Sequence, residues 1–309
     1  MELRRGASRG ARARSSLGER EAQRTERSEA RRRRSGAEPV LGEQLRDRVG
    51  RGGRLDPAHW AGAARARGDV HLEDVETLNR WALEKKLQVT KFSYGVLDSI
   101  KSDYRVLNTG SALGAGVGPL LVGHPDLISI PPEQQTIALP GMHTTAHLLF
   151  KSVFPKATKK LFLRYDAIEG FALEKKGLGV IIHENRFTYT EKGLVKFADL
   201  GEHWEQNTGM PVPLGGIAVR RDLDRDIVRQ LERMIGESIR QARTRTEVIT
   251  PYIARHAQEM GEAVMRQHIE LYVNDYSLDL GEKGRSAILG LMQKNDEDHI
   301  GNNDLFYRG

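Results

Sequence analysis

The sequence has no cysteine among its 309 residues. This absence excludes a disulfide framework, a thiolate metal site and a cysteine nucleophile. No apolar run reaches about eighteen residues, so we expect no membrane-spanning helix. The arginine-rich N-terminus lacks the apolar segment that a secretory signal needs, and the sequence therefore fits a cytoplasmic protein.

An excess of basic charge is also absent from most of the chain, although the net charge is +6. Residues 1–68 contain eighteen Arg, no Lys and nine Asp or Glu, a net of +9, so the remaining 241 residues carry −3. The pI of about 9.5 is therefore no indication that the folded part binds nucleic acid.

Residues 1–68 contain very little to bury, because Arg, Ala, Gly, Ser and Glu dominate them. Such a composition does not offset the entropy cost of ordering, and we expect a disordered, arginine-rich segment. The "RRRR" at Arg31–Arg34 could bind nucleic acid or an anionic membrane. A solvated tail is the simpler interpretation.

From Asp69 onward, strand-like and helix-like patterns alternate. Apolar residues at helical spacing follow Asp74, which is placed to cap a helix. Strands that alternate with helices predict an α/β fold with a largely parallel sheet covered on both faces. Strands are expected within 89–97, 117–123, 136–139, 161–165, 179–183, 193–200 and 215–221, and helices within 143–154, 166–176 and most of the chain after Asp222.

Polar residues follow several of these strands. Open α/β sheets bind ligands at the carboxyl ends of their strands, which selects Lys91, Phe92, Ser93 and Tyr94, the stretch 140–145, and His183 with Glu184. A histidine at a strand end can be a base near neutral pH, with its neighbouring glutamate holding one tautomer. It can equally be structural or solvated, and the position alone does not decide.

The string "PGMHTTAHLL" places two threonines before a helix. Their hydroxyls can cap it, and a plain threonine N-cap is the simpler interpretation. The functional interpretation is a carboxylate docked on Thr145 and on the N–H of Ala146. No second cluster with metal-ligand spacing joins His143 and His147, so no metal site is expected.

Seven strings from "HLEDVETLNRWAL" to "YVNDYSLDLGEKG" occur in order, among them "TKFSY", "GSALGAGVGPLLV", "PGMHTTA", "GVIIHENRFTY" and "DLGEHWEQNTGMPVPLGGIAVRRDL". Together they closely resemble the 1,4-dihydroxy-6-naphthoate synthase family of the futalosine route to menaquinone. The resemblance implies a two-lobed fold like that of type II periplasmic binding proteins, with a ligand cleft between the lobes. It implies lobe one at 69–122 plus 218–309, lobe two at 135–213, and hinge crossings at 123–134 and 214–217.

The resemblance also implies a lyase reaction that needs no metal, nucleotide or redox cofactor. The substrate would be cyclic dehypoxanthinylfutalosine, a small molecule, and the product 1,4-dihydroxy-6-naphthoate. The histidine of the "IIHE" string, His183, would be the proton acceptor. Residues implied to contact the substrate are Asn79, Lys91, Phe92, Ser93, Thr145 and Ala146.

The sequence departs from the family at its start. The family begins with a strand and a "Ser-Pro-Cys-Pro-Asn-Asp-Thr-Phe" loop, and nothing like it occurs in residues 1–68. One hypothesis is that this segment is read from a wrong frame or a wrong start, which the coding DNA would reveal. A chain that lacks this strand would expose unpaired backbone edges in lobe one and put its activity in doubt.

Three alternatives stay open at this point. Chorismate dehydratase of the same pathway is the enzymatic rival, although the "IIHE" string favours the synthase. A non-catalytic solute-binding protein of the same fold would need an export signal or a lipid-anchor cysteine. A nucleic-acid-binding role rests on the arginine-rich segment alone, so nucleic acid and membrane are not the expected partners.

Overall fold

The computed structural model describes residues 71–244, 261–293 and 304–307. The expected disorder of residues 1–68 and the hypothesis about their reading frame lie outside the described residues. In the described ranges, no helix combines the length and apolarity needed to cross a membrane.

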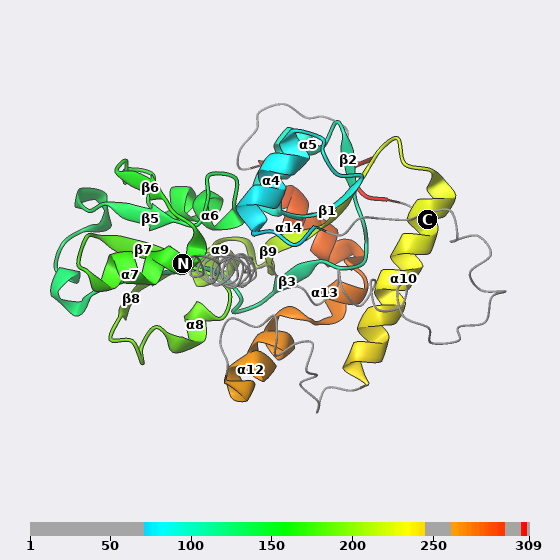
Figure 1. Cartoon of the computed structure of the whole chain (residues 1–309). Helices are drawn as coiled ribbons and strands as arrows, with labels where there is room; N and C mark the ends of the chain where they lie inside the picture. The colour runs from blue at the N-terminus through cyan, green and yellow to red at the C-terminus, as the bar shows by residue number, and fades with distance from the viewer. Residues whose placement is uncertain (1–70, 245–260, 294–303, 308–309) are drawn as a thin grey trace, which may run out of the picture.

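Two separate sheets organise the fold, and they lie side by side in Figure 1. We call the part built on the four-stranded sheet lobe one and the part built on the five-stranded sheet lobe two. Lobe one contains β1 (Val89–Ser93), β2 (Tyr104–Val106), β3 (Ala112–Gly114) and β9 (Val212–Arg220), with β9 pairing all three others. Lobe two has the order β6 (Lys160–Phe162), β5 (Ile137–Leu139), β7 (Leu178–Ile181), β4 (Leu120–Gly123) and β8 (Val195–Asp199).

The expectation of a largely parallel sheet is wrong. Between the described strands, only β5 with β6 and β5 with β7 run parallel. Every antiparallel pair contains β4 or β9, which are the first strands after the chain passes from one sheet to the other. An α-helix that connects two strands of the same sheet makes those strands parallel, and this rule holds inside lobe two. It does not apply to β4 and β9, because no helical crossover within one sheet precedes either strand.

The sheet pairing also differs from the boundaries that the family resemblance implies. Residues 120–122 fall inside the predicted lobe one, yet as part of β4 they pair with β7 and β8 in lobe two. The chain passes between the sheets at 115–119 and again at 209–211. The predicted crossing at 214–217 lies within β9, and residues 215–217 of it pair with β1. A buried apolar strand has no sequence mark for the sheet it joins, which explains the difference.

Helices cover both sheets. Side-chain caps begin several of them: Asp74 accepts the N–H groups of Glu76 and Thr77, as predicted, and Asp199 and Asp224 do the same for their helices. Lobe one has α4 (Val75–Leu83), η2 (Tyr94–Val96), α5 (Leu97–Ile100), α10 (Arg225–Arg243), α12 (Glu262–Tyr272), α13 (Asp275–Leu278) and α14 (Gly281–Gln293). Lobe two has η3 (Pro125–Leu127), η4 (Pro132–Gln134), α6 (Thr145–Val153), η5 (Tyr165–Ala167), α7 (Ile168–Leu173), α8 (Asn185–Thr188) and α9 (Leu200–Thr208).

Strand β9 shows how the core is divided. Ile217 and Val219 pack in a cluster with the apolar face of α10, whereas Ala218 between them joins the large central cluster. This alternation follows from the two-residue period of a strand. The central cluster contains residues from both sheets, including Phe92 of β1 and Leu139 of β5. Lobe one and lobe two therefore share a continuous apolar core.

Strand β1 is an edge strand in the part of the chain that the structure describes, where it pairs with β9 alone. An unpaired strand edge needs other partners for its backbone groups. The Ser93 N–H finds one in the side-chain oxygen of Asn79, at 2.9 Å. Asn79 belongs to α4, which packs against β1, so a buried side chain takes the place of a neighbouring strand here.

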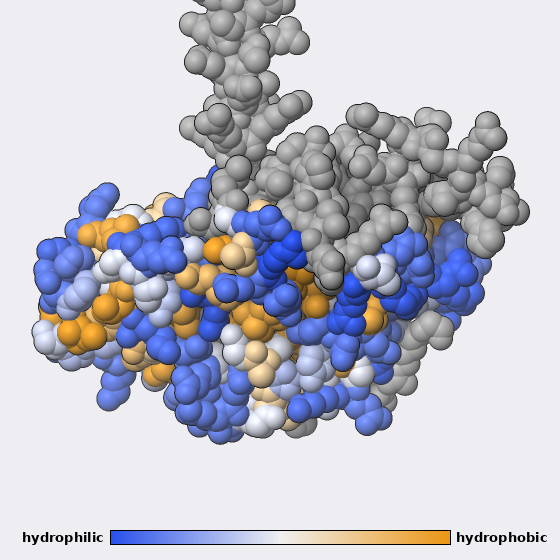
Figure 2. Space-filling model, turned by 90° about the horizontal axis from the view of Figure 1, so that it is seen from below, coloured by the Kyte–Doolittle hydropathy of each residue, from blue (hydrophilic) through white to orange (hydrophobic). Residues whose placement is uncertain are grey.

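Exposed apolar residues concentrate on lobe two. Figure 2 shows hydrophobic patches among hydrophilic residues over this part of the molecule. Five of the six large apolar side chains that are exposed in the described ranges belong to lobe two: Ile128, Ile130, Met142, Leu161 and Leu173. The sixth, Ile227, is on α10.

Candidate active site

The side chains at the end of β1 lie on the two opposite faces of the strand. Phe92 is fully buried in the core, where its ring meets Tyr94 edge-on at 5.2 Å between centroids. Lys91 and Ser93 lie on the opposite face of the strand because side chains alternate. Of the predicted substrate contacts on β1, Lys91 and Ser93 thus share a face, while Phe92 is part of the core.

Ser93 and Thr145 join the two lobes through a closed set of hydrogen bonds. The Thr145 N–H donates to Ser93 Oγ at 2.7 Å, and the two hydroxyl oxygens are 3.0 Å apart. Thr145 Oγ1 donates to the Leu214 carbonyl at 2.8 Å and accepts the Gly95 N–H at 3.1 Å. We call Ser93 and Thr145 with these partners the hydroxyl cluster. Both side chains are buried, and the cluster ties β1 and β9 to the start of α6.

Asn79 lies behind this cluster and is fully buried. Its side-chain oxygen accepts the Ser93 N–H at 2.9 Å, and its amide nitrogen donates to the His143 carbonyl at 3.2 Å. The family resemblance implies that Asn79 contacts the substrate. In the structure, the Asn79 side chain is hydrogen-bonded to the backbone of Ser93 and of His143, and it thereby connects the end of β1 to the loop before α6.

The N-terminus of α6 has the predicted cap. Thr144 is the N-cap, and its hydroxyl accepts the His147 N–H at 3.2 Å. Ser93 accepts the Thr145 N–H and the Thr144 carbonyl accepts the Leu148 N–H. Among the hydrogen bonds between described residues, the Ala146 N–H has no partner. Within this first turn, Ala146 offers the N–H that a ligand carboxylate could accept.

His183 follows β7 and has an unusual backbone conformation. Its φ is +58°, in the left-handed region that non-glycine residues seldom adopt. Such a conformation costs about 1–3 kcal/mol and persists only where the surrounding structure imposes it, often at functional sites. The ring meets Tyr165 edge-on, with centroids 5.4 Å apart. The backbone at the end of β7 and the Tyr165 ring therefore both contribute to the position of this imidazole.

Electrostatics keep His183 neutral. Burial lowers its pKa to about 4, Glu184 opposes that change, and the charge of Lys91 lowers the pKa further. The residue as a whole is half-buried. At pH 7 the ring is therefore an uncharged imidazole, which is the protonation state that a general base requires.

Lys91 is the cation of this region. Burial lowers its pKa to about 8. It is half-buried, like His183, and it remains mostly protonated at pH 7. Its charge lowers the pKa values of both His183 and His268. An ammonium group in such a place attracts an anionic ligand.

A second histidine, which the sequence analysis missed, faces His183 from lobe one. His268 of α12 has its ring centroid 6.4 Å from that of His183 and 4.6 Å from that of Tyr272. Burial lowers its pKa to about 3, with His183 and Lys91 contributing after burial. We call Tyr165, His183, His268 and Tyr272 the imidazole cluster. The available signal was the four-residue spacing of His268 and Tyr272, which places both on one helix face.

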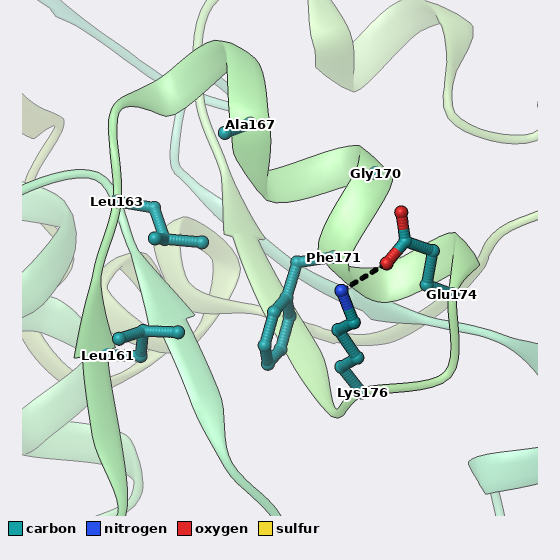
Figure 3. A pocket seen from close by; sticks show the side chains of 7 residues that line it. All are labelled: Leu161, Leu163, Ala167, Gly170, Phe171, Glu174 and Lys176. Carbon is teal, nitrogen blue, oxygen red and sulfur yellow. Dashed lines mark ion pairs between the residues drawn. The ribbon is translucent and has the colours of Figure 1, made fainter.

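A separate hollow of about 360 Å³ lies between β6 and α7 in lobe two (Figure 3). Its walls are mostly apolar, with Leu161, Leu163 and Phe171 facing the hollow and the ion pair of Glu174 with Lys176 on one side. None of its lining residues belongs to the hydroxyl cluster or the imidazole cluster. In the described ranges, no group of three His, Cys, Asp or Glu side chains could hold a metal ion.

Comparison with known sequences gives a consistent picture. Residues 56–297 match the family model described as "Menaquinone biosynthesis". Over 221 residues the chain is 43% identical to a 1,4-dihydroxy-6-naphthoate synthase of Thermus thermophilus, covering 71% of this chain and 80% of that protein. The synthase of Streptomyces coelicolor is 39% identical over 232 residues, covering 73% and 82%.

Solved structures support the fold. Protein AF1704 of Archaeoglobus fulgidus superposes with a TM-score of 0.68 at 29% identity, covering 76% of this chain and 90% of that one. The periplasmic aliphatic sulphonate binding protein SsuA of Escherichia coli has a TM-score of 0.56 at 8% identity, covering 87% and 89%. The predicted α/β fold like that of periplasmic binding proteins is confirmed.

Proposed function

The chain belongs to the menaquinone-biosynthesis family of 1,4-dihydroxy-6-naphthoate synthases, and from this membership we propose that it is a lyase with His183 as its proton acceptor. The proposed substrate is cyclic dehypoxanthinylfutalosine, and the product is 1,4-dihydroxy-6-naphthoate. In this proposal His183 removes a proton from the sugar-derived part, which then separates from the aromatic acid.

The observation that carries this proposal is a neutral imidazole, fixed at a strand end, between groups from both lobes. A base must be unprotonated before it reacts, and the lowered pKa of His183 secures that state. The same lowering weakens the ring as a base. An anionic ligand beside the ring would raise its pKa again, because opposite charges favour the protonated form. Binding of the substrate would therefore strengthen the base when it is needed.

Two groups support binding of the naphthoate carboxylate. Lys91 provides a positive charge near His183, and the first turn of α6 provides the Ala146 N–H. Ion pairing with an ammonium group and hydrogen bonding to a helix N-terminus both favour an anion. Ser93 and Thr145 bond each other in this structure. Their proposed role is to hold β1 and α6 in register beside the carboxylate.

Lobe closure fits the same proposal. Lys91 and His268 belong to lobe one, whereas His183 and Ala146 belong to lobe two. A ligand between them would contact both lobes at once. Drawing the lobes together excludes water and aligns the base with the sugar-derived part.

An assay with purified full-length chain tests the proposal. Cyclic dehypoxanthinylfutalosine is supplied in one series and chorismate in another, and the products are separated by chromatography. We expect 1,4-dihydroxy-6-naphthoate in the first series and unchanged chorismate in the second. Turnover of chorismate would favour the dehydratase alternative. Tight binding of the first compound without turnover would favour a solute-binding protein. The cytoplasmic location stays a prediction.

A further inference from the structure

His268 has a feature that packing alone does not explain. Its Nε2 atom is buried, and no described residue forms a hydrogen bond with it. A buried polar atom without a partner costs about 1–3 kcal/mol, so native structures seldom leave one unless a ligand or water fills the place. The ring is otherwise in favourable contact with Tyr272, four residues later on the same helix.

The position of His268 points to a ligand that also meets His183. The two ring centroids are 6.4 Å apart, and the rings are tilted by 53°. This separation is within the range of a ring–ring contact, so a ligand atom that meets one ring lies close to the other. His183 belongs to lobe two, whereas α12 packs against β3 of lobe one. The two imidazoles therefore approach the same space from opposite lobes.

The charges nearby favour a hydrogen-bond donor over a second base. The pKa of His268 is lowered to about 3 by burial and by the neighbouring His183 and Lys91, so its ring stays neutral at pH 7. A neutral imidazole has one N–H, and with the proton on Nε2 the ring can donate to an oxygen. Tyr272 and Lys91 are the other titratable groups beside it.

We propose that His268 donates a hydrogen bond from Nε2 to the sugar-derived oxygen on which negative charge develops when His183 accepts its proton. The inference rests on the proposed function, because it uses the same substrate and the same base. The proton moves from the substrate to His183, and the charge left on the substrate is stabilised by the N–H of His268. A fixed donor of this kind typically accelerates a reaction by about 10²–10³-fold.

Two substitutions separate this role from a structural one. His268→Leu removes the donor and keeps most of the volume, whereas His268→Gln keeps an amide N–H on a side chain of similar reach. We expect kcat to fall by about 10²–10³-fold in the Leu variant and to recover at least about tenfold in the Gln variant. KM should change by less than about threefold in both, because the interaction forms in the transition state.

Exposed His203 on α9 provides the matched control. His203→Leu and His203→Gln should keep the wild-type kcat. The inference would be overturned if His268→Leu kept kcat within about threefold of wild type. It would also be overturned if the Leu and Gln variants lost activity to the same extent and their melting temperatures fell by the same amount. Loss of packing would then explain the loss of activity.

A second readout separates this inference from the proposed function. The imidazole resonances of His268, assigned by their loss in His268→Gln, are followed by NMR in His183→Asn while cyclic dehypoxanthinylfutalosine is added. We expect them to shift as the substrate binds. If the wild-type chain does not turn over this substrate, the proposed function is wrong. A shift of the His268 resonances would still establish His268 as a ligand contact in that case. Unshifted resonances in a chain whose wild type turns over the substrate would end the inference.

Discussion

The hydroxyl cluster and the imidazole cluster lie in the same region and differ in how far their polar groups are satisfied. Ser93 and Thr145 exchange hydrogen bonds with each other and with backbone groups of both lobes. In the imidazole cluster, burial holds two rings neutral, and His268 Nε2 has no partner among the described residues. The first cluster is complete without a ligand, and the second is not.

This difference teaches how one site can be both rigid and reactive. Saturated hydrogen bonds stabilise a single arrangement, and their loss is expected to lower stability. Unsatisfied or strained groups cost stability and are kept where a reaction uses them. Substitutions in the hydroxyl cluster should therefore change unfolding more than turnover, and substitutions in the imidazole cluster should do the reverse.

The largest expected effect is the loss of turnover in His183→Asn. Removing the base should lower kcat by about 10²–10⁴-fold, the usual contribution of general base catalysis. Asparagine tolerates the left-handed backbone of this position, so the melting temperature should stay within about 2 °C of wild type. Steady-state kinetics and thermal unfolding check the two halves of this expectation. A kcat within tenfold of wild type would remove His183 from its proposed role.

The hydroxyl cluster should give the opposite pattern in Thr145→Val. The substitution keeps the shape and leaves the Gly95 N–H without its acceptor. It also removes the shorter of two hydrogen bonds to the Leu214 carbonyl, which keeps only the 3.4 Å bond from Ser93 Oγ. We expect the free energy of unfolding to fall by about 2–4 kcal/mol, at roughly 1–3 kcal/mol for each buried group left unsatisfied. Urea unfolding measures it, and Thr190→Val, at an exposed position, should change little. An unchanged midpoint would show that the cluster does not stabilise the fold.

Lys91→Met should sharpen the comparison by moving stability and binding in opposite directions. Burial disfavours the charged ammonium group, as its lowered pKa shows, so removing the charge should raise the melting temperature slightly. Affinity for 1,4-dihydroxy-6-naphthoate should fall by about tenfold or more, because a charged hydrogen bond contributes roughly 1.5–3 kcal/mol. Calorimetric titration measures the affinity, with exposed Lys151→Met as control. Unchanged affinity would place the carboxylate elsewhere.

The last expected effect is a pH dependence of stability from the imidazole cluster. The folded pKa values of His183 and His268 lie near 4 and 3, below the ordinary 6.5. The unfolded chain therefore binds more protons in this range. The stability from these neutral rings is fully present above pH 6.5 and decreases as the pH falls through 6.5 toward 4. Melting temperatures between pH 7 and 5 should fall less steeply in His183→Asn than in wild type or in His203→Asn. Equal slopes would contradict the lowered pKa of His183.

Local signals predicted most of the individual elements. Asp74 and Thr144 cap the helices where their spacing indicated. The apolar run at 136–139 contains the buried strand β5, and the run at 179–183 overlaps β7. These features depend on neighbours within a few residues, which a sequence displays directly. The short strands β2 and β3 were missed, because three residues provide too little alternation to recognise.

Strand direction and the second imidazole could not be predicted in the same way. The direction of β4 and β9 depends on which sheet each joins after a crossing, and no local pattern records that choice. His183 was a candidate because it ends an apolar strand, whereas His268 lies in the middle of an amphipathic helix. Its importance depends on a contact between residues 85 positions apart, which a single sequence does not show.

The dependence of lobe one on β9 has a consequence for how the chain is made. Within the described residues, β1, β2 and β3 share β9 as their strand partner, and β9 follows them by about a hundred residues. Lobe two uses one continuous stretch, so its strands can pair before β9 is made. At about 5–20 residues per second, the earlier strands wait several seconds for their partner. During that interval, the cell's chaperones have three unpaired strands to protect from aggregation.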